Sequence, residues 1–421
     1  MFPFLGIARA ILALIPDMMF NPLSPRFFLF WLFVLAVSFQ YRRIAANERR
    51  LFGQVKNRPF PQTVHAVVQG MLAGVAGSFL LVFVGVTFTP GAQFGYLILL
   101  AMLLMLVSPR LICLAYAGGL ASLSSLAFGF PAVDVAALLA MVAILHLMES
   151  LLITLTGFRT ATPAFIRTQG REVVGGFSLQ RFWPIPFVVL LLGAVPREVV
   201  EQGIRMPGWW PLIPVAPRLL EDPDMMFQML PVIAVMGYGD LAVSRSPVRR
   251  SRETGKYLAL YSLVLLGLAL LGGRHPLFLW PAAVAAIVGH ELVIRRGGRA
   301  ELGRPAWLKS LPGQLTILDV MPGLPADHAG LRTGDVVRTV NAHAVGSRAE
   351  FTAALEQAGP VIELGVERPG GPVTVVIAGP IWTDRRLGIL LAPEPGDLPQ
   401  MEIGRPGILA AFVRRLLRGR R

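Results

Sequence analysis

The chain has 421 residues, a length that would suit two or three soluble domains, yet 54% of its residues are hydrophobic and only 15% are charged. Together with a mean hydropathy of +0.61, these proportions exclude an ordinary soluble protein and predict a polytopic membrane protein. The net charge of +14 does not indicate nucleic-acid binding, because the arginines form short clusters between apolar runs, where they set the orientation of a membrane protein.

The first apolar stretch, residues 1–20, contains Arg9 and Asp17, and Pro16 interrupts it near its end. Two charges are costly inside a bilayer, so this segment either crosses the membrane or lies in its surface as an amphipathic helix. We expect no cleavable signal peptide, because the stretch lacks a basic start and a small-residue cleavage site.

Residues 27–41 predict one clear span, and a basic run over residues 42–58 follows it. Residues 64–157 are long enough, at about 1.5 Å per helical residue, for about four crossings. We divide this region where proline interrupts it, at 89–91, 108–110 and 129–131. Small residues in its first helix predict close packing against a neighbour. They are Gly70, Gly74, Gly77 and Gly85.

Four further apolar segments are predicted to be spans: residues 184–195, 225–244, 257–272 and 276–294. The loop between the first two is mainly acidic, whereas the loops after residues 41, 157, 244 and 294 are rich in arginine. Arginine-rich loops remain in the cytoplasm, and even numbers of spans separate these loops. Hydropathy and loop charge therefore predict about 9–10 transmembrane helices in the cytoplasmic membrane, with the C-terminal part of the chain in the cytoplasm.

Cys113 is the single cysteine, which excludes a disulfide within the chain, and from it we predict neither a thiolate metal site nor a cofactor. His290 and Glu291 begin the His-Glu-x-x-His pattern of zinc proteases, but Ile294 stands where the second histidine is needed. We therefore predict that the protein is not an enzyme.

Ionisable residues within predicted spans are candidates for function. His146 and Glu149 are three positions apart on one helix face, and Asp134 precedes them by a few turns. A transport site is one interpretation of these three residues, and a polar contact between helices is the other. Asp240 and Glu291 stand near the ends of predicted spans, where helix capping or pairing with a neighbouring arginine explains them.

Residues 325–337, with the sequence PADHAGLRTGDVV, resemble the central signature of a PDZ domain, a module that binds an extended peptide as an added strand. Ala329 and Gly330 allow a tight turn, and Gly334 with Asp335 leads into the next strand. Asp335 is expected to accept hydrogen bonds from turn amides. The pattern predicts strands over 315–320, 361–367 and 373–377 and a helix over 349–358.

Residues 386–391, RLGILL, resemble the carboxylate-binding loop of such domains and the strand after it. In that loop, backbone N–H groups form a nest for a terminal carboxylate. The loop follows the other strands, so the predicted α+β domain has a permuted strand order. An ordinary edge strand is the alternative. The predicted peptide-binding residues are Arg385, Arg386, Leu387, Gly388, Ile389, Leu391, Phe351 and Leu355.

The chain is therefore predicted to divide into a transmembrane domain (1–300), a linker (301–312), a PDZ domain (313–395) and a basic tail (396–421). Within the tail, residues 408–421 alternate apolar and arginine residues at helical spacing. This segment is either an amphipathic helix on anionic lipid or a solvated tail.

Several motifs resemble MinJ-type proteins, the topological determinants of cell division in rod-shaped Gram-positive bacteria. They are residues 41–44, 48–50, 106–110 and 149–152, together with the permuted PDZ-like region. The resemblance implies a membrane adaptor at poles and septa that links a DivIVA-type scaffold to the MinD-type inhibitor ATPase. A PDZ-containing membrane regulator or protease-like protein is the alternative.

Overall fold

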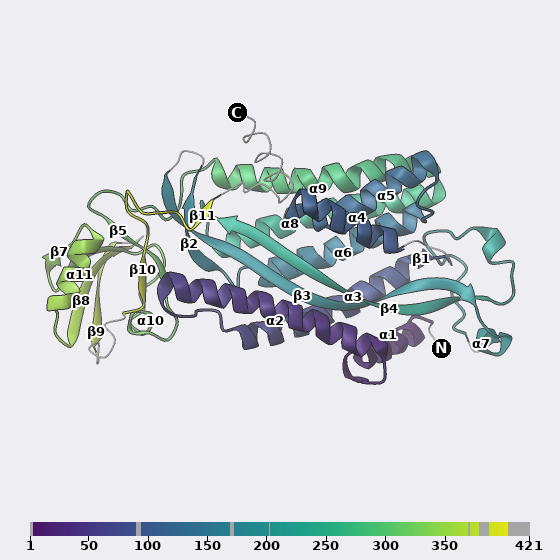
Figure 1. Ribbon diagram of the computed structural model, residues 1–421, viewed down its shortest axis with the longest axis horizontal. Helices are drawn as coiled ribbons and strands as arrows, with labels where there is room; N and C mark the ends of the chain where they lie inside the picture. Colours follow the sequence, from purple (N-terminus) through teal and green to yellow (C-terminus); the bar gives the residue numbers. More distant parts are fainter. Residues whose placement is uncertain are drawn as a thin grey trace, which may run out of the picture.

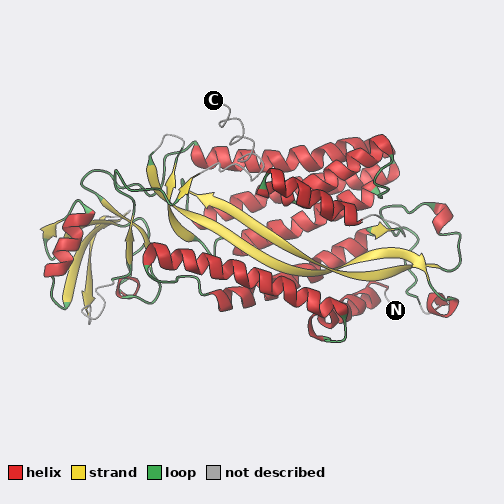
Figure 2. Cartoon of the chain, viewed as in Figure 1, coloured by secondary structure: helices red, strands yellow, loops and turns green. Residues whose placement is uncertain are grey.

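The structure is a computed structural model that describes residues 3–89, 94–168, 172–201, 203–368, 371–378 and 387–402. A helical region forms the larger part of the molecule, and a small α+β domain lies at one end of it (Figure 1). A long two-stranded ribbon runs along the helices (Figure 2).

Six of the described helices are long and apolar enough to cross a membrane: α1 (Pro3–Phe20), α2 (Pro25–Phe52), α3 (Pro59–Val84), α6 (Val135–Thr156), α8 (Pro247–Arg274) and α9 (Leu279–Leu302). Two shorter apolar helices are α4 (Phe94–Val107) and α5 (Leu114–Phe128). Helices α3 to α6 are the four predicted between residues 64 and 157. The predicted fold class, an α-helical membrane region followed by a small α+β domain, is confirmed, and the protein is a membrane protein.

Local sequence explains where these helices begin and end. Proline occupies the first turn of α2, α3 and α8, where its missing N–H costs nothing. Gly53 and Gly85 end α2 and α3 in the left-handed conformation, with φ of 70° and 78°. Proline and glycine therefore set these helix boundaries locally.

The prediction that residues 184–195 and 225–244 are helical spans was wrong. They belong to two long antiparallel strands, β3 (Val173–Ala194) and β4 (Met225–Ala242), and every residue of β4 has a partner on β3. Strand β3 packs mainly on α3, and in the view of Figure 1 the ribbon passes above α1 and α2 and below α8 and α9. A strand buried by helices is as apolar as a membrane helix, so hydropathy alone does not separate the two.

The edge of β3 that faces away from β4 shows how a strand is accommodated among helices. N–H groups at every second residue point toward this edge, and in apolar surroundings each needs a partner. The Val188 N–H donates to the Ser78 hydroxyl (2.9 Å), and the Phe182 N–H donates to a tyrosine hydroxyl (3.2 Å). Between them, Pro184 and Pro186 have no N–H to satisfy. The two prolines are therefore the sequence signal of an edge strand, at the point where hydropathy predicts the start of a helix.

Helix α3 packs directly on the backbone of this edge. A Cβ atom at Gly70 would overlap the carbonyl oxygen of Pro184, and one at Gly74 would overlap that of Pro186. Because a backbone oxygen cannot move aside as a flexible side chain does, both positions require glycine. The close packing predicted for these glycines is therefore against a strand, whereas Gly77 faces α6.

The α+β domain is built on a sheet with the strand order β10-β5-β6-β8-β9, in which β7 also pairs with β6. Its elements are β5 (Leu315–Val320), α10 (Pro325–His328), β6 (Val336–Val340), β7 (His343–Ala344), α11 (Arg348–Gln357), β8 (Val361–Arg368), β9 (Gly371–Ala378) and β10 (Ile389–Leu391). The last strand pairs antiparallel with the first, so the strand order is permuted as predicted. Among the described residues, the outer edge of β10 has no strand partner.

Short elements complete the fold. β1 (Thr87–Phe88) and β2 (Thr162–Arg167) pair with β3, and β11 (Met401–Glu402) pairs with β2. Helix α7 (Arg197–Glu201) lies in the loop between β3 and β4, at the opposite end of the molecule from the α+β domain (Figure 1).

The segment before the α+β domain is fixed to the helical region. The Trp307 N–H donates to the Val243 carbonyl (2.8 Å), and the Gly175 N–H donates to the Leu308 carbonyl (2.9 Å). The Glu301 carboxylate accepts the Val243 N–H (2.7 Å). The basic C-terminal ends of α2 and α9, the basic start of α8 and the segment before β3 all lie at the end of the helical region that carries the α+β domain (Figure 1).

Candidate peptide-binding groove and polar sites of the helical region

The unpaired edge of β10 lies beside the start of α11. The Ser347 side chain caps this helix by accepting the Glu350 N–H (3.2 Å). The next residue, Arg348, donates from its guanidinium group to the Ala392 carbonyl (3.4 Å), directly after β10. A free strand edge next to a helix is the arrangement that accepts an extended peptide by strand addition.

Gly388 shapes the entry to β10. Its φ is +82°, and a Cβ atom there would lie 2.6 Å from Cβ of Leu324. The carbonyl of Gly388 accepts the Met321 N–H (2.8 Å), and the carbonyl of Leu387 accepts the Ala326 N–H (2.9 Å). The glycine is therefore required by the packing of this loop onto the turn before α10, and not only by the approach of a ligand.

The predicted lining residues differ in exposure. Leu387, Leu391 and Phe351 are buried in the core of the α+β domain. Ile389 on β10 and Leu355 on α11 are only partly buried against this core, so their side chains provide the apolar surface that a ligand could contact. Arg385 and Arg386 lie outside the described residues.

An ion pair fastens the chain that follows β10 to α11. The Arg348 guanidinium donates to both carboxylate oxygens of Asp397, at 2.7 and 3.3 Å, and the Arg348 N–H donates to the Glu394 carboxylate (2.6 Å). Partial burial raises the pKa of Asp397, but the hydrogen bonds from Arg348 and the Glu394 N–H, with the charge of Arg348, hold it below its ordinary value. These contacts hold residues 392–397 beside the start of α11.

The turn predicted from the PDZ-like signature has the expected geometry. Gly330 and Gly334 have φ of +79° and +90°, which favour glycine. Ala329 follows α10 directly. The buried Asp335 carboxylate accepts the Arg332 N–H (2.9 Å) and two hydrogen bonds from Arg368, at 2.9 and 2.7 Å. Asp335 therefore joins the turn to β8.

The predicted polar residues of the helical region do not form one site. Asp134 caps α6 by accepting the Ala137 N–H (2.8 Å), and Glu149 lies four turns further along the same helix. Glu291 on α9 accepts hydrogen bonds from the Tyr116 hydroxyl and from Arg295, both at 2.6 Å. These separate contacts account for Asp134 and Glu291 as structural residues.

Asp240 is in β4 and not at the end of a helix, so its predicted role as a helix cap was wrong. Its carboxylate accepts hydrogen bonds from Arg250 and Thr254 of α8, both at 2.8 Å, and from the Tyr238 hydroxyl (3.2 Å). It therefore attaches the ribbon to α8.

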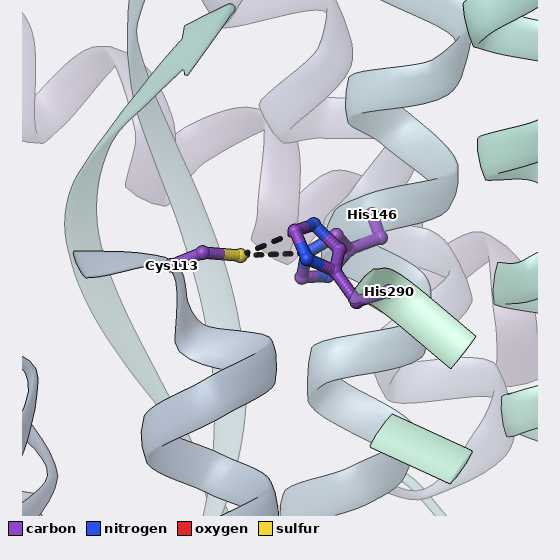
Figure 3. Close-up of side chains that lie close together, drawn as sticks. All are labelled: Cys113, His146 and His290. Carbon is purple, nitrogen blue, oxygen red and sulfur yellow. Dashed lines mark hydrogen bonds between the residues drawn. The ribbon is translucent and has the colours of Figure 1, made fainter. Parts of the chain in front are cut away.

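A cluster that the sequence interpretation missed unites the single cysteine with two histidines. Cys113 precedes α5, His146 is in α6 and His290 is in α9, yet Sγ of Cys113 lies 3.0 Å from Nε2 of His146 and 3.6 Å from Nε2 of His290 (Figure 3). The prediction of no thiolate metal site assumed that one cysteine is too few. A mixed site needs only one thiolate. The available signal was the presence of two histidines and a cysteine in apolar runs, but their spacing did not show that the helices bring them together.

Comparison with known proteins agrees with this architecture. Residues 316–368 match the family model described as "PDZ domain". Over 200 residues, the chain is 23% identical to the cell division topological determinant MinJ of Bacillus subtilis (strain 168), and the match covers 46% of each chain. The match thus spans about half the length of this curated relative. The chain is a membrane protein with a C-terminal PDZ domain, and the predicted resemblance to a MinJ-type cell-division protein is confirmed as a distant one.

Proposed function

We propose that this protein is a non-enzymatic membrane adaptor that recruits partner proteins through its PDZ domain. The observation that supports this most is the unpaired outer edge of β10 beside α11, in a domain fixed to a membrane region. Anchoring a peptide-binding module at the membrane raises its effective concentration toward other membrane-bound proteins.

The partner segment would add to β10 as an antiparallel strand, with α11 as the second wall of the groove. Main-chain hydrogen bonds to β10 would give affinity, and the side chains of Ile389 and Leu355 would select apolar residues of the partner. Arg385 and Arg386, before the loop at Gly388, would attract an acidic or carboxylate end of the segment.

We infer a role in division-site selection. The similarity to a protein named as a cell division topological determinant supports this role. We further propose that the PDZ domain and the membrane region bridge a DivIVA-type polar scaffold and a MinD-type inhibitor at septa and poles.

We propose that the PDZ domain lies in the cytoplasm. The basic segments that meet at its end of the molecule support this orientation by the positive-inside rule. In a Cys113→Ser background, a membrane-impermeant maleimide applied to intact cells with a permeabilised outer envelope should label Glu198→Cys, in α7, and leave Thr374→Cys, on β9, unlabelled. Labelling of Thr374→Cys without labelling of Glu198→Cys would reverse the orientation.

We also propose that the chain divides as its composition indicates, with a transmembrane domain over 1–300, a linker over 301–312, a PDZ domain over 313–395 and a tail over 396–421. The tail would bind anionic lipid through its arginines, each contributing about 1 kcal/mol near a charged surface. Residues 403–421, which include its amphipathic part, lie outside the described residues.

The experiment that tests the adaptor function compares two glycine variants in cells. Gly388→Glu places a charged side chain at the entry to β10, whereas Gly330→Glu places one at similar φ in an exposed turn away from the groove. The first variant should stay in the membrane and lose its enrichment at division sites, and the second should keep it. Normal enrichment of an inserted Gly388→Glu protein would contradict the proposal.

A further inference from the structure

We infer that Cys113, His146 and His290 form a binding site for one Zn²⁺ ion inside the helical region. Cys113 directly precedes α5, His146 is in α6 and His290 is in α9, and their ligand atoms all lie within 4.8 Å of one another. Among the cysteine, histidine, aspartate and glutamate residues that the structure describes, these three lie close enough together for one ion to contact all of them.

The distances agree with a shared ion. Zinc binds thiolate at about 2.3 Å and imidazole nitrogen at about 2.0–2.1 Å in tetrahedral geometry, which places sulfur and nitrogen ligands roughly 3.5 Å apart. The observed separations of Sγ from the two Nε2 atoms, 3.0 and 3.6 Å, bracket this value. Figure 3 shows the sulfur pointing toward both imidazole rings.

The hydrogen bonding of His146 leaves the lone pair of its Nε2 atom facing Cys113. Its Nδ1 lies 2.7 Å from the Val142 carbonyl oxygen, which only accepts, so Nδ1 carries the proton and Nε2 faces Sγ unprotonated. A ligating histidine is typically fixed in this way by a backbone carbonyl behind it.

Without an ion, the thiol can donate its one proton to Nε2 of His146, and His290 can then contact the sulfur only by donating an Nε2–H. That tautomer leaves an unused lone pair on the buried Nδ1 of His290. His290 is 9% exposed, and its Nδ1 has no hydrogen-bond partner, so protein contacts leave this ring poorly satisfied. An ion bound by the thiolate and both Nε2 atoms would use all three lone pairs.

The surroundings hold the ligands rigidly. The Tyr261 ring packs against both imidazoles, with centroids 5.7 Å away in each case, and the Tyr116 ring packs against His290 at 5.2 Å. Beside the cluster, α5 approaches α9 so closely that a Cβ atom at Gly119 would lie 2.5 Å from the Ile287 side chain. With three protein ligands, the fourth position of the ion is open to water or another small ligand. The bound ion would tie three helices together.

The test uses the full-length protein in detergent, stripped of metal and then equilibrated with Zn²⁺. We expect one Zn²⁺ per chain, and loss of this ion in Cys113→Ser, His146→Gln and His290→Gln. The control variant His65→Gln, at an exposed position of α3, should keep it. Co²⁺ as a probe should give sulfur-to-metal charge-transfer absorption that Cys113→Ser lacks.

A second measurement needs no variant. Because Cys113 is the single cysteine, maleimide labelling reports on this thiol alone. Zn²⁺ should slow the labelling at least tenfold, and chelation should restore it. An unchanged labelling rate, or a Zn²⁺ content that all three substitutions leave intact, would overturn the site.

Discussion

The ammonium group of Lys56, in the loop after α2, lies 2.5 Å from the carboxylate of Asp319 on β5 of the PDZ domain. Both side chains are largely withdrawn from water, with exposures of 21% and 8%. Thr333 also donates to the Asp319 carboxylate (3.4 Å). Together with the backbone hydrogen bonds of Trp307 and Leu308, this ion pair fixes the PDZ domain against the helical region.

Replacing Asp319 by Asn should loosen this attachment. A hydrogen bond to a charged group contributes about 1.5–3 kcal/mol, and the variant leaves the Lys56 ammonium without its counterion. Hydrogen exchange in residues 303–312 should therefore become faster. The exposed pair Lys309–Glu172, with exposures of 42% and 62%, is the matched control, and Lys309→Met should change the same exchange by less than about 1 kcal/mol. Equal effects of the two variants would contradict the special role of Lys56.

Substituting Gly388 by Ala should destabilise the groove more than the same change at Gly330. Both glycines have φ near +80°, so both variants incur about 1–2 kcal/mol of backbone strain. Only at Gly388 does the new methyl group meet Leu324, which adds about 1–3 kcal/mol of overpacking. Amide exchange in β5 and β10 measures the difference, and an equal loss of protection in both variants would refute the proposed packing.

Substituting Gly74 by Ala should destabilise the helical region by about 1–3 kcal/mol, because its Cβ would overlap the Pro186 carbonyl oxygen. Gly267 of α8 is the control, since a Cβ atom there meets nothing within 4 Å. Gly267→Ala should change stability by less than about 1 kcal/mol. Thermal unfolding in detergent compares the two, and a Gly74→Ala protein as stable as the native one would argue against α3 packing on β3.

The contact between Arg348 and Asp397 should depend on pH in the acidic range. The pKa of Asp397 is lowered in the folded protein, so its stabilisation is fully present above the unfolded-state pKa and is lost as the pH falls through the lower folded-state value. Protection of residues 392–397 should therefore exceed that of Asp397→Asn near neutral pH. This advantage should begin to fall near pH 3.8, the ordinary pKa of the group, and should disappear only below the lower folded-state pKa. A constant difference between the two proteins down to low pH would contradict the assignment.

The sequence was sufficient for the parts of the fold that are specified locally. Proline and glycine marked the boundaries of α3 to α6, and the turn from Ala329 to Asp335 identified the PDZ domain. It was not sufficient for the β3–β4 ribbon, because residues 184–195 are apolar enough for a span. The prolines at alternating positions 184 and 186 carried the contrary signal. This signal can be interpreted only once α3 is known to pack against that edge of β3, where a residue without an N–H group needs no acceptor from the helix.

The site residues divide in the same way. Gly388 and Ile389 could be located because the loop and the strand that form one wall of a PDZ groove are consecutive in the sequence. Cys113, His146 and His290 could not be brought together from spacing, because helix packing sets their proximity and no short motif contains them.

The central claim, that a partner segment joins the outer edge of β10, is tested most directly by photo-cross-linking in living cells. A photoreactive residue at position 389, on β10, is compared with one at Val376, an exposed position of β9 at the opposite edge of the sheet. The account predicts an adduct from position 389 that maps to one extended segment of a partner and disappears in the Gly388→Glu protein, with no such adduct from position 376. An adduct from position 376 alone, or one from position 389 that persists in the Gly388→Glu protein, would contradict it.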